Sequence, residues 1–367
     1  MNRPFNSAVD IVYLWVNGSD PAWRDKRRNA AKRLEAQGMR GLAPFSNVEG
    51  RYRDNEELRY SLRALERFFP HHGQVYLVTD GQVPDWLAAT PRLTVVDHRE
   101  LIPTACLPTF DSGNIESYIH RIPNLSERYF YLNDDVFFGA PVRVEDWFWE
   151  HGTYVAWSQD AAVSDGPLRP DANSLENASR LSKQWLDAHP GPLEAGPYRH
   201  TFRTFAHAPR PMCKSVVQAL EIQAPDLFAQ VRSTVFRVWD KPTIVSDFIL
   251  RWSLSRGLAR LRDYDYRYVA TGLAGTSDEL SELVDACGAL DFFCINDTTD
   301  NAHDHDTRLA RVRDSLECMF PVQSCFERVG ALPQRRRRHP TRTGWTAPGQ
   351  RAPLNLETHL KLTHEHL

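Results

Sequence analysis

Residues 10–16, DIVYLWV, form a run of β-branched and aromatic side chains that ends at the polar turn NGSD, residues 17–20. Such a run predicts a buried strand followed by a loop. Similar runs occur at residues 74–79, 93–96, 129–132 and 292–295. Between the first two strands, residues 56–69 have apolar side chains at helical spacing. The chain therefore alternates strands with helical segments.

Alternating strands and helices predict an α/β fold with a Rossmann-like, mainly parallel sheet flanked by helices. Residues of about 160–260 interrupt this pattern, because they are first rich in Pro, Gly and Asn and then helical. We expect a largely helical insertion there, with a short helix near 174–188 and helices again over 211–258. We predict one domain over residues 1–330 and a basic, partly flexible C-terminal tail over residues 331–367.

The composition is that of a globular protein. The chain has 367 residues, of which 42% are hydrophobic and 25% charged, and its net charge is −3. This balance argues against a nucleic-acid partner bound through overall charge. No apolar run is long enough to span a bilayer, and residues 1–10 lack the apolar core of a signal peptide. We expect a cytoplasmic protein, and the arginines at 335–338 suggest peripheral contact with the inner face of the membrane, with a solvated tail as the alternative.

The six cysteines do not match a standard zinc site. The last four form two Cys-x6-Cys pairs, whereas structural zinc sites use tighter spacing. Two alternatives remain open, buried free thiols or one or two late disulfides. The cysteines are Cys106, Cys213, Cys287, Cys294, Cys318 and Cys325.

Polar clusters follow three of the predicted strands. In parallel sheets, ligands bind outside the carboxyl ends of the strands. Asp134 and Asp135 end one strand, and such a carboxylate pair suits a hard divalent cation such as Mg²⁺ or Mn²⁺. Only one of the two need face the metal, because consecutive strand residues point to opposite sides. Asn296 and Asp297 follow the late strand and would complete an oxygen site with Asp135; an ordinary turn or helix cap is the alternative for the aspartate pair.

The turn after the first strand is a candidate nucleotide-binding loop. Asn17 opens it, Gly18 permits close backbone approach, and Asp20 could bind a ribose hydroxyl or the metal. An ordinary turn is the alternative.

Residues 53–63, RDNEELRYSLR, combine a helix start with both signs of charge. Asp54 or Asn55 as helix cap and Glu57 in the first turn explain most of this pattern. Arg53 is left over, and arginine suits a pyrophosphate. His207 and Arg237 lie in the helical second half, where a lone histidine is usually structural unless it is tied to the strand-end clusters.

These segments together resemble the Stealth family of hexose-1-phosphate transferases, which includes bacterial capsular polysaccharide phosphotransferases and the catalytic subunit of lysosomal-enzyme N-acetylglucosamine-1-phosphotransferase. The family has four blocks in order. The first is similar to residues 10–20, and the second to residues 53–63, 78–82, 107–110, 115–116, 120–122 and 131–135. The third resembles HAP at 207–209 followed by Arg237, and the fourth CINDT at 294–298. The third block departs from the family pattern, since Val238, Trp239 and Pro242 replace charged residues.

The resemblance implies a glycosyltransferase-A-like fold and a metal-dependent reaction. Hexose-1-phosphate, expected to be N-acetylhexosamine-1-phosphate, would pass from a UDP-sugar to a sugar hydroxyl in capsule or exopolysaccharide synthesis, with release of UMP. The large insertions of the animal enzyme, which select protein substrates, are absent from this sequence, which favours a glycan acceptor over a protein. A metal-dependent glycosyltransferase that releases UDP and a non-catalytic binding protein are the alternatives.

The resemblance also implies residue roles. Asp135, His207 and Arg237 would be catalytic, with His207 as the base and Arg237 on the phosphoryl oxygens. Mg²⁺ or Mn²⁺ would bind Asp135 with Asn296 or Asp297. The substrate-binding residues would be Asn17, Gly18, Asp20, Arg53, Asn55, Glu57, Glu116 and Asp134.

Overall fold

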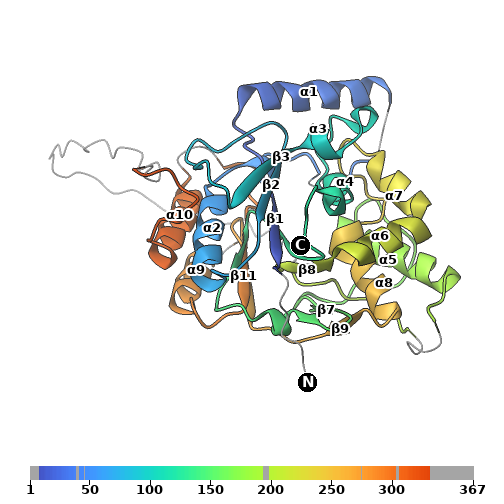
Figure 1. Cartoon of the computed structure of the whole chain (residues 1–367). Helices are drawn as coiled ribbons and strands as arrows, with labels where there is room; N and C mark the ends of the chain where they lie inside the picture. Colours follow the sequence, from blue (N-terminus) through green and yellow to red (C-terminus); the bar gives the residue numbers. More distant parts are fainter. Residues whose placement is uncertain are drawn as a thin grey trace, which may run out of the picture. The chain divides into compact units, whose positions relative to one another are not determined.

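The centre of the fold is a five-stranded sheet in the order β3-β2-β1-β4-β8 (Figure 1). Its first four strands run parallel, and β8 joins the edge of β4 antiparallel. The order of the parallel strands, 3-2-1-4, is that of a Rossmann-like sheet. The bounds are β1 Asp10–Leu14, β2 Val75–Thr79, β3 Leu93–Asp97, β4 Arg128–Asn133 and β8 Arg210–Cys213. The prediction of a mainly parallel, Rossmann-like α/β sheet is confirmed.

This computed structural model describes residues 8–38, 41–44, 46–192, 198–273, 275–302 and 306–330. The described chain up to Val329 is one compact unit. The predicted basic tail, with its expected membrane contact, lies outside the described residues. Among the helices that are described, none combines the length and the apolar character needed to cross a membrane.

Two smaller sheets adjoin the central one. The first contains β10 Tyr266–Ala270, β11 Phe292–Asn296 and β5 Val136–Phe138, with β10 parallel and β5 antiparallel to β11. The second contains β6 Phe148–Trp149, β7 Gly152–Val155 and β9 Ala259–Leu261. Of these six strands, the apolar pattern predicted only β11.

The unbroken apolar run of β1 reflects burial on both faces of the sheet. Ile11 and Tyr13 belong to the core beneath α2, α9 and α10, whereas Val12 and Leu14 belong to the core beneath the helices on the opposite side (Figure 1). A strand covered on both faces is apolar throughout rather than alternating. The first group is α2 Glu57–Phe68, α9 Thr276–Asp285 and α10 Thr307–Met319; the second includes α4 Ser112–Glu116, α6 Lys214–Gln223, α7 Pro225–Arg232 and α8 Ile249–Ser255.

Shorter elements complete the fold. Helix α1, Pro21–Ala36, follows the carboxyl end of β1 at the top of Figure 1. Helix α3 is His98–Leu101, and the 3₁₀ turns are η1 Gly50–Tyr52, η2 Thr104–Cys106, η3 Ile119–Arg121 and η4 Val144–Asp146.

Between residues 160 and 260 the described chain contains helices α5 (Ser174–Ala188), α6, α7 and α8, which are separated by segments without helix. Helix α5 has the expected bounds. It begins after Asn173, whose side chain caps its first turn. The prediction of helix from residue 211 is wrong at its start, where β8 pairs with β4 before α6 begins. The strand is four residues long and contains Pro211, which is tolerated at a sheet edge but leaves no alternating pattern. A π-helical turn, η6 Ile244–Phe248, precedes α8.

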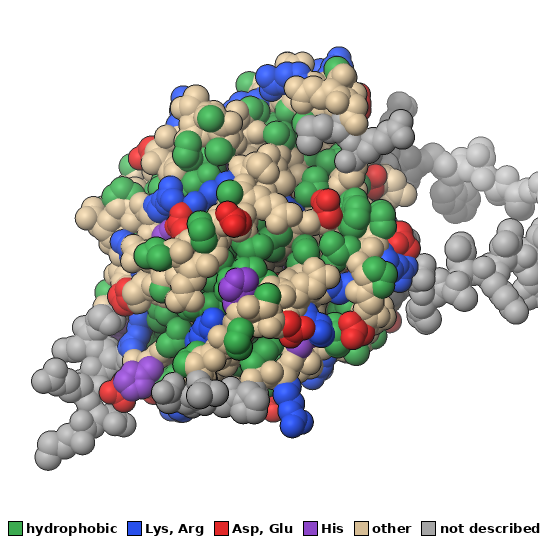
Figure 2. Space-filling model, turned by 90° about the vertical axis from the view of Figure 1, so that its right-hand side faces the viewer, with side chains coloured by type: hydrophobic (Ala, Val, Ile, Leu, Met, Phe, Trp, Pro, Cys, Tyr) green, Lys and Arg blue, Asp and Glu red, His purple; other side chains and the backbone are tan. Residues whose placement is uncertain are grey.

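The face turned to the viewer in Figure 2 is the right-hand side of Figure 1, which the insertion helices form. Acidic and basic side chains are interspersed there among apolar ones instead of gathering in one basic patch (Figure 2). This mixture offers no broad field for a polyanion on that face.

Candidate active site

The turn between β4 and β5 brings two sheets together at Asp134 and Asp135. The Asp135 carbonyl accepts a hydrogen bond from the backbone N–H of Ile295 in β11, at 3.0 Å. In the same pairing Cys294 lies opposite Val136. The strand ends that carry residues 133–135 and 294–297 are therefore neighbours, although about 160 residues separate them in the sequence.

The antiparallel pairing of β8 with β4 places His207 at this edge. Arg210 lies opposite Tyr131, so the residues that precede β8 adjoin the end of β4. His207 Nε2 is 2.8 Å from the Asn133 side-chain nitrogen, and its Nδ1 is 3.7 Å from the Cys294 sulfur. This histidine is thus tied to a strand-end cluster, which is the condition under which a functional role was expected.

The electrostatics keep His207 and Cys294 uncharged. Burial lowers the pKa of His207, although the neighbouring Asp135 carboxylate acts in the opposite direction. Burial and Asp135 raise the pKa of the Cys294 thiol well above its ordinary value, and this thiol lies 3.5 Å from Asp135 Oδ2. A neutral imidazole at neutral pH is able to accept a proton. All six cysteines are free, so the disulfide alternative is wrong.

A second group of acidic residues surrounds Asp134. Burial, together with Asp135, Glu57 and Asp54, raises the pKa of Asp134 well above its ordinary value. Burial and Asp54 raise the pKa of Glu57 to about 8, and burial raises that of Asp54 to about 6. Carboxyl groups that lie close together with little contact to water disfavour one another's ionisation unless a cation compensates their negative charge.

These residues fit a divalent cation. Asp135 Oδ1 is buried and has no hydrogen-bond partner among the described residues, and it adjoins the carboxylate group just described. Donor atoms of Asp135, His207 and Cys294 all lie within 4.8 Å of one another. The carboxylates suit Mg²⁺ or Mn²⁺, whereas the imidazole and thiol suit transition metals. Asp135 lies beside Cys294 and His207, whereas Asp134 is influenced by Glu57 and Asp54; both aspartates belong to the turn between β4 and β5 and not to a strand.

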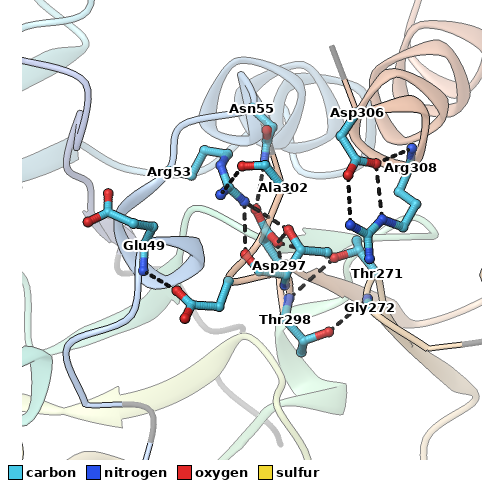
Figure 3. Close-up of polar contacts among 12 residues, drawn as sticks. Glu49, Arg53, Asn55, Thr271, Gly272, Asp297, Thr298, Ala302, Asp306 and Arg308 are labelled. Carbon is cyan, nitrogen blue, oxygen red and sulfur yellow. Dashed lines mark hydrogen bonds and ion pairs between the residues drawn. The ribbon is translucent and has the colours of Figure 1, made fainter. Parts of the chain in front are cut away.

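Asp297 is held by protein donors (Figure 3). Its Oδ1 accepts hydrogen bonds from the Thr299 backbone at 2.8 Å, the Thr299 hydroxyl at 2.6 Å and the Thr271 hydroxyl at 3.3 Å. Its Oδ2 accepts from the Arg53 guanidinium and from the Asn55 amide. Arg53, expected on a pyrophosphate, also donates to Thr299 and to the Ala302 carbonyl. The arrangement fastens the β11 loop to the segment before α2.

Two further predicted residues support this loop and helix. Asn296 donates a hydrogen bond from its side-chain amide to the Tyr268 hydroxyl, at 2.6 Å. Glu57 accepts from the backbone and side-chain nitrogens of Asn55, at 2.6 and 2.8 Å. Asn55 therefore bridges the acidic group and Asp297.

The loop after β1 is fixed by a residue that the site prediction omitted. Gln82 accepts from the Asn17 backbone at 3.0 Å and donates to Asp20 Oδ2 at 2.9 Å. Asp20 also caps α1, so one of its oxygens accepts hydrogen bonds from the first turn of that helix. A Cβ on Gly18 would lie 2.2 Å from the Tyr52 carbonyl oxygen, which accepts the Gly18 N–H at 2.7 Å. Only glycine permits this approach.

A hydrogen-bonded chain extends from Glu116 to His207. The Tyr131 hydroxyl lies 2.9 Å from Glu116 Oε1 and 2.5 Å from Asn133 Oδ1, and Asn133 contacts His207. Burial raises the pKa of Glu116, whose Oε2 is buried without a partner in the described structure. Arg237 lies beyond, where its guanidinium donates to the hydroxyls of Ser112 at 3.0 Å and Ser174 at 3.3 Å.

Family models match three parts of the chain: Stealth conserved region 1 at residues 8–35, region 2 at residues 51–156 and region 4 at residues 288–338. Together they cover about half of the sequence and contain every site residue predicted from the sequence except His207 and Arg237. The chain belongs to the Stealth family. His207 and Arg237 lie outside the three matches, so their assignment as the third block stays a prediction.

Curated relatives carry a more specific name. The chain is 34% identical over 325 residues to exopolysaccharide phosphotransferase SCO2592 of Streptomyces coelicolor, covering 87% of this chain and 33% of that protein. It is 31% identical over 332 residues to exopolysaccharide phosphotransferase CpsY of Mycobacterium tuberculosis, covering 89% and 59%. The chain thus spans between one third and three fifths of the length of these relatives.

Solved structures with a similar arrangement include two sugar transferases. The galactosyltransferase LgtC, solved with donor and acceptor sugar analogues, is 10% identical with a TM-score of 0.43 and matches 86% of this chain and 97% of its own. Mouse xyloside xylosyltransferase 1 is 11% identical with a TM-score of 0.37 and matches 81% and 100%.

Proposed function

We propose that this protein is a sugar-phosphate transferase of exopolysaccharide or capsule synthesis. It transfers hexose-1-phosphate, with N-acetylhexosamine as the expected sugar, from a UDP-sugar to a glycan hydroxyl and releases UMP. The observation that carries this proposal is the convergence of a histidine whose pKa is lowered and a group of buried and half-buried carboxylates at the carboxyl edge of a Rossmann-like sheet. The names of the curated relatives support the same activity.

The proposed reaction forms one bond and breaks one. The acceptor oxygen forms a bond to the β-phosphorus of the donor, and the bond from that phosphorus to the UMP oxygen breaks. His207 accepts the proton of the attacking hydroxyl, for which its lowered pKa keeps it unprotonated. The proton goes to Nε2, which accepts from the Asn133 amide in this structure, so the attacking hydroxyl takes the place of that amide; the Tyr131 hydroxyl and Glu116 hold Asn133 from behind. Such a base contributes about 10²–10⁴-fold in rate.

Asp135 is the residue we assign to the metal, with Asp134 and Glu57 contributing negative charge. A bound Mg²⁺ or Mn²⁺ would neutralise phosphate oxygens and the departing nucleotide. Asn296 and Asp297 are assigned a supporting role, because their side chains already bind Tyr268 and Arg53.

The donor and acceptor parts of the site follow from position. Asn17, Gly18 and Asp20 form the loop next to β1 where the nucleotide would bind, at the carboxyl edge that such ligands use. Arg237 would hold the phosphoryl oxygens. Its two serine partners are neutral, so they do not balance the charge of its guanidinium group.

The test is the identity of the released nucleotide. The purified protein is incubated with Mg²⁺ or Mn²⁺, a panel of UDP-sugars and short glycan acceptors, and the nucleotide is identified by chromatography. We expect UMP release, and we expect EDTA, Asp135→Asn and His207→Gln to abolish it. Asp171→Asn changes an exposed residue and serves as the control that retains UMP release. Release of UDP would show glycosyl transfer instead, and donor binding without turnover would show a binding protein.

A further inference from the structure

The turn η1, Gly50–Tyr52, is enclosed by three loops of the site. A Cβ on Gly50 would lie 2.7 Å from the Thr299 carbonyl oxygen, so the turn abuts the loop after β11. The Tyr52 carbonyl contacts Gly18, and the Tyr52 hydroxyl donates to the Phe110 carbonyl at 3.0 Å, just before α4. The residue between Gly50 and Tyr52 is Arg51. Its position is therefore fixed by the nucleotide loop, the Asp297 loop and the start of α4.

Arg51 and Arg53 differ in what they bind. Arg53 has partners on Asp297, Thr299 and Ala302. Arg51 Nε is buried and has no hydrogen-bond partner among the described residues. A buried guanidinium nitrogen without an acceptor is costly, because burial removes its water and nothing replaces it.

A second arginine, Arg237, is held at the start of α4, next to the backbone that the Tyr52 hydroxyl contacts. Among the residues that the structure describes, the Arg237 guanidinium donates hydrogen bonds only to two serine hydroxyls; the Asp111 carboxylate is 4.0 Å away and is already paired with Lys241. Burial and the nearby charge of Arg51 lower the pKa of Arg237 to about 10. Arg51 and Arg237 also lower the pKa of His207, although less than its burial does. Two like charges are thus held close to the base.

We propose that Arg51 and Arg237 form a two-arginine anion site that takes the diphosphate of the donor, a role that the sequence suggested for Arg53. The assignment rests on the proposed function, because it names the group through which the donor is held. A diphosphate supplies acceptor oxygens for Arg51 Nε and negative charge for both guanidinium groups. The diphosphate would lie between Gly18 of the nucleotide loop and His207.

The experiment measures binding of inorganic pyrophosphate and UDP, in EDTA, by isothermal titration and thermal denaturation. EDTA removes any metal contribution from Asp135. Arg51→Gln should weaken binding of either ligand about tenfold to a hundredfold, the usual effect of losing a charge-assisted contact. Arg51→Gln should melt no lower than wild type without ligand, since it removes an unpaired, repelled charge. Arg51→Lys should recover part of the affinity.

Arg53→Gln is the matched control. It should lower the melting temperature without ligand, because it breaks the pair with Asp297, but leave the ligand-induced increase in melting temperature intact. The proposal is overturned if pyrophosphate does not bind wild type, or if Arg51→Gln binds it normally. It is also overturned if Arg51→Gln is as unstable as Arg53→Gln, which would indicate a structural residue. If no UDP-sugar yields UMP while Arg51-dependent binding persists, the reaction assignment fails and the anion site stands.

Discussion

Replacement of Asp297 by Asn should destabilise the protein even when no metal is present. The side chains of Asp297 and Arg53 are only 6% and 17% exposed. Breaking a buried ion pair costs about 3–5 kcal/mol, because the remaining charge loses its partner. Arg53 keeps its bonds to Thr299 and Ala302, and an asparagine oxygen can still accept from the donors around Oδ1. We therefore expect a loss of about 2–3 kcal/mol.

The assay is urea denaturation in EDTA, with stability taken from the midpoint and the m-value. Asp135→Asn is the contrasting variant: its buried Oδ1 has no partner in the described structure, and its charge raises the pKa of Asp134. Without metal, Asp135→Asn should be as stable as wild type or more stable. The reasoning would be refuted if Asp297→Asn unfolded within about 0.5 kcal/mol of wild type in EDTA, the range of an ordinary surface substitution, and lost stability only relative to the Mg²⁺-loaded protein. Asp297 would then be primarily a metal ligand.

Three other perturbations address separate parts of the fold. Glu327→Gln should cost about 3–5 kcal/mol in urea denaturation, because Glu327 is buried between two arginines of α2; a loss below about 1 kcal/mol would contradict this. Glu57 has its pKa raised to about 8 by burial and Asp54, so the folded protein binds this proton at a pH where the unfolded chain has released it. Stability is therefore lost as the pH rises from about 4.5 to 8, and between pH 5 and 8 metal-free wild type should lose about 3 kcal/mol relative to Glu57→Gln; parallel pH profiles of the two proteins would disprove it. Gly18→Ala should cost about 1–3 kcal/mol and weaken UDP binding, since the new methyl group meets the Tyr52 carbonyl; unchanged melting and UDP titration would argue against the close approach.

The sequence predicted the strands whose signal is local. Strands β1 and β2 are buried on both faces, and β4 and β11 likewise appear as continuous apolar runs. Strand β8 escaped prediction, because its four residues include Pro211 and its pairing depends on the exposed edge of β4. Strand β5 has three residues and is defined by its partner β11. Short strands of this kind are fixed by tertiary contacts and not by their own pattern.

The same distinction holds for the site. The location of Asp134 and Asp135 at the end of a strand could be predicted from the apolar run that precedes them, but the turn that joins β4 to the short strand β5 could not. The bond between Arg53 and Asp297 joins residues 244 positions apart, which no local pattern indicates. Gln82 and Cys294 each lie inside a block that resembles the family. Gln82 follows β2 and Cys294 lies within β11, and these positions were the only indication of their role. No pattern in the sequence singled out Arg51. Only the structure shows that Arg53 is paired with Asp297, whereas Arg51 Nε is without a hydrogen-bond partner among the described residues.

The backbone bond between Asp135 and Ile295 has a consequence for synthesis of the chain. Strand β5 emerges early, but its partner β11 follows only after more than 150 further residues. Contacts between such distant segments form late, because the intervening loop must first be closed. Until β11 docks, the Asp135 turn has one of its two sheets missing and Cys294 is absent from it. A nascent chain that has folded its four parallel strands therefore has the proposed nucleotide loop but not the complete proposed site, and we expect activity only after β11 is in place.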